Sequence, residues 1–145
     1  MAVVCLGLLQ CRQVQNSGRR TKKANPKPSA SDALKRLNDV QKGLGFATTS
    51  KIAYFCGLEF DEGPALTYDK NVIDAIRNDV DCGNFKNTRF HLGKGKAFYH
   101  RGVTSYGSHI QEAKQLADRW KVCPDQIEAA LFRSRVSERS GWSSS

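Results

Sequence analysis

The sixteen residues Lys86–Arg101, KNTRFHLGKGKAFYHR, decide how the rest of this chain is interpreted. They hold five basic residues, no acidic residue, three aromatic residues and two histidines around a Gly-Lys-Gly centre. Phe90 and Leu92 alternate with polar neighbours, as the residues of a half-buried β-strand do. Residues 93–96 supply turn residues, so the pattern predicts a β-hairpin that pairs residues 88–92 with residues 97–101.

The predicted hairpin combines positive charges with planar rings. Single-stranded nucleic acid is bound by this combination, because bases stack on aromatic rings and phosphates pair with cations. We therefore expect the hairpin to bind nucleic acid, with RNA favoured over DNA. The alternative is an exposed hairpin whose lysines only discourage edge pairing. The expected contact residues of the hairpin are Lys86, Arg89, Lys94, Lys96, Tyr99 and Arg101.

The net charge of the chain supports an anionic partner. Lys and Arg number 23 against 14 Asp and Glu, which gives +9. The excess lies in the predicted hairpin and in residues 1–31, which carry six basic side chains and no acidic one. Residues 1–29 are interpreted as a flexible basic arm that follows phosphates, as a cleavable organellar targeting segment, or as a tail without a role. The arm's expected contact residues are Arg19, Arg20, Lys22 and Lys23.

Helical patterns surround the predicted hairpin. Ser31 is expected to cap a first helix, and a second helix near residues 48–58 is expected to bury Phe55 and Cys56. A third helix is expected over Asp69–Val80. The fold class is therefore α+β, a small mainly helical domain with one basic β-hairpin, flanked by a flexible basic N-terminal arm. The domain is placed at residues 30–134, and residues 135–145 are a polar tail.

The C-terminal part predicts two further helices, one capped at Ser108 and one beginning at Pro124. Residues 115–131, QLADRWKVCPDQIEAAL, resemble the helix-turn-helix of DNA-binding proteins. Two departures favour a plain packed helix pair instead. Lys121 stands where the turn glycine is usual, and acidic side chains at the start of the second helix would repel phosphate; these polar positions are Asp125, Gln126 and Glu128.

The residues give no support for catalysis or for a bound cofactor or metal. The five cysteines form no C-x-x-C pair, so free thiols in a reducing intracellular compartment are expected. Ala97 follows the Gly-Lys-Gly-Lys run, which excludes a phosphate-binding P-loop. The apolar residues 1–9 are too few to span a bilayer.

These observations predict a non-enzymatic protein that binds nucleic acid through a basic, aromatic hairpin and a basic arm, in the manner of viral or ribonucleoprotein structural proteins. The alternative is an organelle-imported structural or assembly subunit whose hairpin binds an acidic protein partner. A homo-oligomer is compatible with both interpretations.

Overall fold

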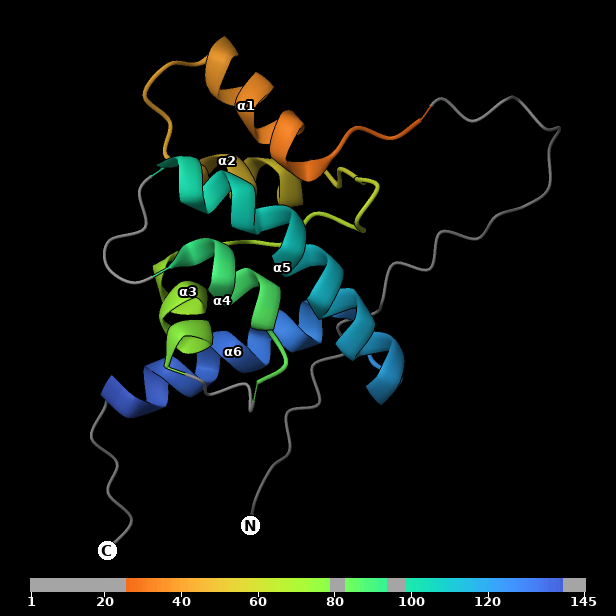
Figure 1. The fold of residues 1–145 in the computed structure, drawn as a ribbon, viewed down its shortest axis with the longest axis vertical. Helices are drawn as coiled ribbons and strands as arrows, with labels where there is room; N and C mark the ends of the chain where they lie inside the picture. The colour runs from red at the N-terminus through yellow and green to blue at the C-terminus, as the bar shows by residue number, and fades with distance from the viewer. Residues whose placement is uncertain (1–25, 79–82, 94–98, 140–145) are drawn as a thin grey trace, which may run out of the picture.

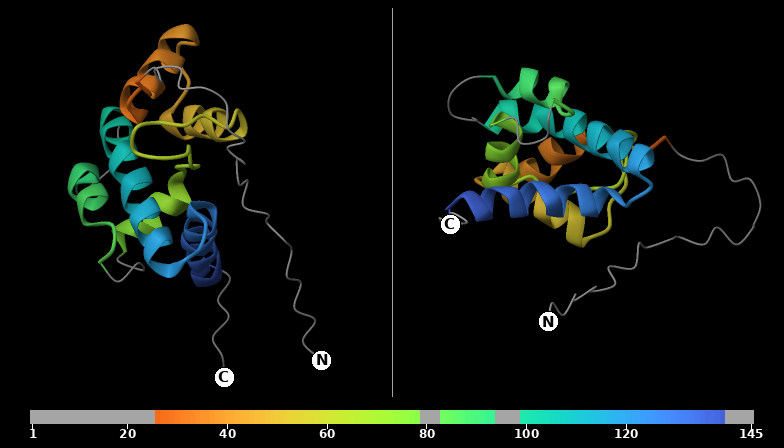
Figure 2. Two further views of the ribbon diagram at one scale, coloured as in Figure 1. Left: turned by 90° about the vertical axis from the view of Figure 1, so that its right-hand side faces the viewer. Right: turned by 90° about the horizontal axis from the view of Figure 1, so that it is seen from below.

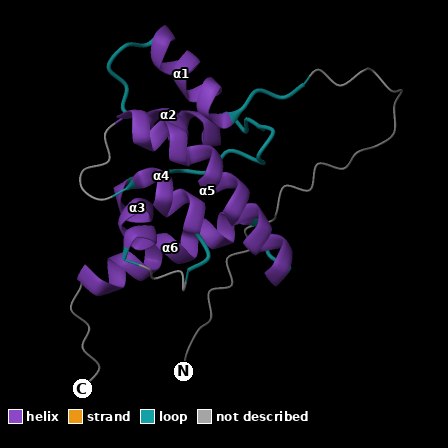
Figure 3. Ribbon diagram, viewed as in Figure 1, coloured by secondary structure: helices purple, strands orange, loops and turns teal. Residues whose placement is uncertain are grey.

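The computed structural model describes residues 26–78, 83–93 and 99–139, and within these ranges the chain is helical (Figure 1). The helices are α1 (Ala30–Val40), α2 (Phe46–Phe55), α3 (Lys70–Arg77), α4 (Lys86–Leu92), α5 (Tyr99–Trp120) and α6 (Pro124–Arg139). No β-strand occurs in the described ranges, where the one β-type pairing is an isolated bridge between Glu59 and Pro64 (Figure 3). The fold is therefore all-α in its described part.

The predicted β-hairpin is wrong, because residues 86–92 form helix α4 and residues 99–101 begin helix α5. The buried residues of α4 are Thr88 and Leu92, which are four positions apart as on one helix face, while Phe90 is 81% exposed. Helix α4 starts where Glu112 of α5 accepts hydrogen bonds from the backbone N–H groups of Asn87 and Thr88. This cap comes from 24 residues away, and local alternation cannot reveal it. Residues 94–98 lie outside the described residues.

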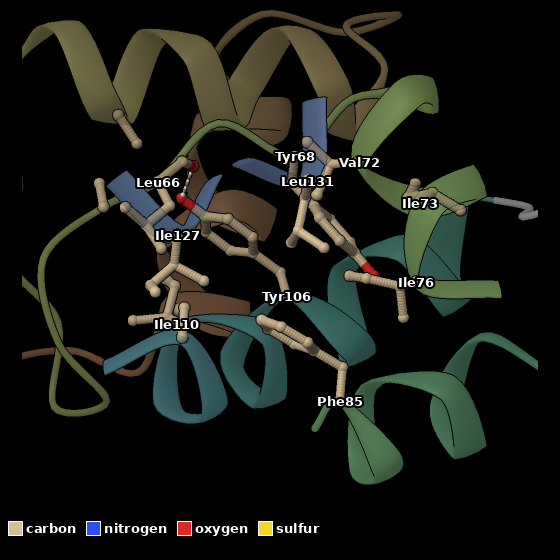
Figure 4. Close-up of a cluster of buried hydrophobic side chains, with 14 of the residues drawn as sticks. Leu66, Tyr68, Val72, Ile73, Ile76, Phe85, Tyr106, Ile110, Ile127 and Leu131 are labelled. Atoms are coloured by element: carbon tan, nitrogen blue, oxygen red, sulfur yellow. Dashed lines mark hydrogen bonds between the residues drawn. The ribbon is translucent and has the colours of Figure 1, made fainter. Parts of the chain in front are cut away.

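Helix α5 contacts both ends of the molecule and organises the core. Its side chains Tyr106 and Ile110 are buried in the apolar cluster that Figure 4 shows, and the helix packs against α1, α2, α4 and α6. The helix begins nine residues before the expected cap at Ser108, which is wrong because Ser108 lies inside the helix. Gly102 explains how α2 reaches this helix, since a Cβ there would lie 2.5 Å from the Phe46 ring. Figure 2 shows α5 lying between α2 on one side and α4 on the other.

The first three helices begin at caps that differ in part from the prediction. Ser29, and not Ser31, caps α1 by accepting a hydrogen bond from the Asp32 N–H. Asp69 caps α3, which runs over Lys70–Arg77 and buries Val72, Ile73 and Ile76, while Val80, where the predicted helix ends, lies outside the described residues. The expected burial of Phe55 and Cys56 is wrong, because α2 buries Thr49, Ser50 and Ala53 instead. The face of α2 that carries Thr49 and Ser50 is turned to the core, and Phe55 is therefore exposed to solvent.

The turn between α5 and α6 bears on the two departures from the helix-turn-helix pattern. Lys121 takes the left-handed backbone conformation, with φ of 57°, that the turn glycine would otherwise adopt. The acidic start of α6 faces the protein, because Glu128 accepts hydrogen bonds from Thr67. Cys123 is disulfide-bonded, and its partner lies outside the described residues. The expectation that every thiol is free is therefore wrong for Cys123, whereas Cys56 is free and exposed.

Candidate active site

A lysine and an aspartate form an ion pair where α2 meets the start of α3. The Lys51 Nζ atom lies 3.6 Å from the Asp69 Oδ2 atom. The lysine side chain is 48% exposed and that of the aspartate 17%, so the pair opens to solvent on the lysine side. The pair therefore places an accessible primary amine beside a largely buried carboxylate.

The helix that follows fixes the Asp69 carboxylate in place. Its Oδ1 atom accepts hydrogen bonds from the N–H groups of Asn71 and Val72, at 2.9 and 3.2 Å. These are unpaired donors of the first turn of α3, and the positive end of the helix dipole favours a carboxylate there. With Oδ1 held by the helix, Oδ2 is the atom that faces Lys51.

The segment leading to Asp69 is tied to the core by buried hydroxyl groups. The Tyr68 N–H donates to Ser50 Oγ at 3.0 Å, next to Lys51 on α2. Tyr106 Oη donates to the Leu66 carbonyl oxygen at 2.7 Å, the dashed bond in Figure 4. These bonds fix the backbone on both sides of Thr67. The position of the carboxylate relative to the amine is thus set by α2 and α5 together.

Helix α6 adds two carboxylates, those of Glu128 and Asp125, beside this segment. Glu128 Oε2 accepts a hydrogen bond from the Thr67 N–H at 2.8 Å, and Oε1 accepts one from Thr67 Oγ1. Burial raises the pKa of Glu128 to about 7, and the neighbouring carboxylates Asp125 and Asp69 act in the same direction, against the lowering effect of the Thr67 bonds. Asp125 also accepts a long hydrogen bond, 3.4 Å, from Tyr54 Oη.

An exposed aromatic side chain, Phe55, stands one helical turn from Lys51. Phe55 is four residues further along α2, so its ring shares a face with the amine, and it is 77% exposed. Tyr54 packs edge-on against this ring, with centroids 5.4 Å apart. A planar ligand that reaches Lys51 would therefore meet an uncovered ring.

The turn before α2 has the form of a backbone-contact site. A Cβ at Gly43 or at Gly45 would meet nothing within 4 Å, so internal packing does not demand glycine at either position. Gly43 has a φ of 89°, and Gly45 caps α2 without a side-chain hydrogen bond. The turn also carries the exposed Lys42. Open glycines beside a helix start leave room for a partner's backbone, and the helix dipole favours an anionic one.

The residues predicted as nucleic-acid contacts do not join this site. Figure 2 places α4, which carries Lys86 and Arg89, on the other side of α5 from α2. Arg89 Nε donates to the Ile76 carbonyl oxygen at 3.0 Å, and the Arg101 guanidinium lies against Gly93 at the end of α4. Both arginines therefore also connect helices. Lys94, Lys96, Arg19, Arg20, Lys22 and Lys23 lie outside the described residues, and nothing is described of the Tyr99 side chain.

The sequence reasoning missed Lys51 and assigned Asp69 only to the start of a helix. Eighteen positions separate the two residues, and no local pattern joins them. A usable signal was the Asp69 cap, because a capping carboxylate keeps one oxygen free for a second partner. The partner itself follows only from how α2 packs against the segment before α3.

None of the helices within the described ranges combines the length and the hydrophobicity that crossing a bilayer requires. In the same ranges, no group of His, Cys, Asp and Glu side chains is gathered as a metal site requires.

Comparison with known proteins identifies a family. Residues 14–132 match the family described as "Putative 8-oxoguanine DNA glycosylase OGG-like protein". The match spans most of the 145 residues, so the chain belongs to this OGG-like family. No curated protein and no solved structure matches the chain.

Family membership corrects the functional prediction. A family described as a DNA glycosylase is enzymatic and acts on DNA, so the predicted non-enzymatic, RNA-favouring function is wrong. The viral or ribonucleoprotein role and the organelle-imported subunit fail for the same reason. Of the predicted partners, nucleic acid is retained as DNA. The acidic protein partner and the homo-oligomer stay predictions.

Proposed function

We propose that this chain is a DNA glycosylase in which Lys51 is the nucleophile and Asp69 its carboxylate partner. The single observation that carries the proposal is the 3.6 Å Lys51–Asp69 pair, in a chain whose family is described by that activity. A lysine amine that attacks a sugar carbon must lose its proton and needs a nearby acceptor. The fixed Oδ2 atom of Asp69 is such an acceptor.

The proposed reaction cleaves the bond between the sugar C1′ atom and the damaged base. As this bond breaks, the base leaves with the electron pair and takes the proton that Lys51 gave to Asp69. Asp69 is then again a carboxylate while positive charge develops on the sugar. The Asp69 carboxylate stabilises that charge while the deprotonated Lys51 amine forms a bond to C1′. Ring opening then gives an imine between Lys51 and C1′, and water hydrolyses the imine to release the enzyme.

The exposed ring of Phe55 on α2 suits the base that must leave the duplex. Enzymes that act on a base inside DNA extrude its nucleotide and hold the base against aromatic or apolar side chains. Phe55 lies one turn from Lys51 and is 77% exposed, so it is the proposed stacking partner, with Tyr54 supporting its edge. The family description makes 8-oxoguanine the base to test first.

The turn at residues 41–45 is the proposed contact for the DNA backbone. From Gly45 to Lys51 the helix rises about 9 Å. This rise is of the order of the distance between neighbouring nucleotides, so a phosphate at the turn would belong to a nucleotide next to the reacting sugar. Gly43 and Gly45 would let a phosphate approach the backbone N–H groups, and Lys42 would pair with it. Lys86 and Arg89 of α4 and Arg101 of α5 stay proposed as further phosphate contacts.

Imine trapping tests this proposal directly. The full chain is incubated with duplex DNA containing 8-oxoguanine and with sodium borohydride, which reduces an imine to a stable covalent link. We expect a protein–DNA adduct with the wild type and none with Lys51→Gln. Asp69→Asn should lower the rate of base release by about 10²-fold or more.

Lys70→Gln is the matched control, because Lys70 follows Asp69 in sequence but pairs with Asp74. It should form the adduct as the wild type does. An undiminished adduct with Lys51→Gln would refute Lys51 as the nucleophile. If the wild type releases no base and forms no adduct, on 8-oxoguanine DNA and on undamaged DNA, the proposed function is refuted.

A further inference from the structure

Glu128 binds the backbone that carries the proposed catalytic carboxylate. Its two oxygens accept hydrogen bonds from both donors of Thr67, the N–H and the Oγ1 hydroxyl. Thr67 is two residues before Asp69, whose own backbone is extended. Helix α6 is therefore linked through one side chain to the residue that faces Lys51.

Among the hydrogen bonds described, those of Glu128 join α6 to this segment, while α6 also packs against α3. Asp125, one turn earlier on α6, bonds to Tyr54 of α2 at the longer distance of 3.4 Å. On the opposite side, Ser50 and Tyr106 hold the residues that flank Thr67. Without Glu128, the Thr67 N–H and hydroxyl would lose their acceptors, and the hydrogen bonds to Ser50 of α2 and Tyr106 of α5 would remain.

We propose that Glu128 is a positioning residue of this enzyme, whose carboxyl group holds Thr67 so that Asp69 stays opposite Lys51. The proposal rests on the proposed glycosylase function. Glu128 contacts neither Asp69 nor Lys51 among the hydrogen bonds and ion pairs described, so it acts through the backbone and not on the substrate.

The protonation of Glu128 should make the proposed positioning role visible in the pH dependence of activity. Its pKa is raised to about 7, first by burial and then by the charges of Asp125 and Asp69. Tyr106 on α5 also faces it, since the Glu128 charge contributes to the raised pKa of that phenol. When Glu128 is protonated, it becomes the donor to Thr67 Oγ1 and the negative charge next to Asp69 disappears. Activity should therefore change near pH 7.

Four variants, measured as single-turnover base release against pH, separate this role from a merely structural one. Glu128→Gln can keep both contacts, with its carbonyl oxygen on the Thr67 N–H and its NH₂ group on Oγ1, but it cannot titrate. It should retain activity and lose the inflection near pH 7. Glu128→Ala should lower the rate by about 10- to 100-fold without weakening DNA binding, because it misplaces Asp69.

The two remaining variants move the inflection in opposite directions. Asp125→Asn removes a charge that raises the Glu128 pKa, so the inflection should shift to lower pH. Thr67→Val removes a hydrogen bond that lowers it, so the inflection should shift to higher pH. Both variants keep the Glu128 carboxyl group, and a general loss of structure would not produce opposite shifts.

The outcomes distinguish this inference from the proposed function. If the wild type forms the imine adduct but Glu128→Gln keeps the inflection, the inference is wrong and the glycosylase function stands. The same holds if Asp125→Asn and Thr67→Val leave the inflection unmoved. If the wild type forms no adduct and releases no base, the proposed function itself has failed.

Discussion

His109 is predicted to make the fold sensitive to acid. It lies on α5, fully buried, with its ring stacked between Tyr68 and Phe85 at centroid distances of 4.7 and 5.5 Å. Neither ring nitrogen has a hydrogen-bond partner among the described residues. Burial without a partner disfavours the charged imidazolium, and it lowers the pKa of His109 from 6.5 to about 3.

The free-energy consequence follows from the two pKa values. Below pH 6.5 the unfolded chain binds a proton at His109 that the folded protein does not bind until about pH 3, so the contribution of His109 to stability falls as the pH falls through this window. Between about pH 7.5 and about pH 5 this difference costs ~2 kcal/mol of the free energy of unfolding. His109→Phe keeps a stacked ring but removes the titration, so it should remove this cost.

Urea unfolding followed by circular dichroism, at both pH values, measures the effect. The quantity to compare is the change in unfolding free energy between the two pH values, in the variant and in the wild type. A packing penalty of about 1–3 kcal/mol from the larger ring is the same at both pH values and cancels. An equal pH dependence in His109→Phe and in the wild type would refute the assignment of a buried, neutral, unpaired histidine.

Three further perturbations test individual contacts. Glu112→Ala leaves the N–H groups of Asn87 and Thr88 and the Thr88 hydroxyl without their acceptor. It should lower the unfolding free energy by about 3 kcal/mol. A loss below about 0.5 kcal/mol would contradict the role of Glu112 as the cap of α4. Gly102→Ala forces a Cβ against the Phe46 ring and should cost about 1–3 kcal/mol in thermal or urea unfolding, whereas Gly45→Ala, which meets open space, should cost only a few tenths. Lys86→Ala should reduce the slope of log K against log salt for duplex DNA by about 0.9, measured by fluorescence anisotropy, while Lys35→Ala on α1 should leave the slope unchanged; equal slopes in Lys86→Ala and the wild type would remove Lys86 from the DNA contacts.

The elements that the sequence predicts correctly are those set by residues that lie close together in the chain. Helix α3 is an example, since Val72, Ile73 and Ile76 lie at helical spacing and are buried as expected. The start of α6 at Pro124 is another, because proline is tolerated in the first turn of a helix. In both cases the residues that set the element lie within a few positions of each other.

The elements that were mispredicted depend on distant partners. Helix α4 requires Glu112, which caps it from α5, and without that knowledge Phe90 and Leu92 read as a strand. Helix α5 passes through Gly102, which marks a close approach of Phe46 and not an end of the helix. The candidate site has the same origin, because Lys51 meets Asp69 only after α2 packs against the segment before α3. A pattern read over a few residues could not join any of these pairs.

The buried ionisable groups of α5 and α6 should oppose each other in their effect on stability. Glu128 has its pKa raised from 4.5 to about 7, so the folded protein binds a proton that the unfolded chain has lost in this window. Its contribution therefore grows as the pH falls from about 7.5 to about 5, by ~2 kcal/mol, which is close to what His109 loses.

The wild-type unfolding free energy should thus change little between these pH values. Glu128→Gln should uncover the full loss at His109, so that this variant becomes ~2 kcal/mol less stable at about pH 5 than at about pH 7.5. The double variant Glu128→Gln/His109→Phe should again be flat. A wild type that loses ~2 kcal/mol over this range while Glu128→Gln behaves identically would show that Glu128 is ionised throughout. It would then also remove the expected inflection in activity near pH 7.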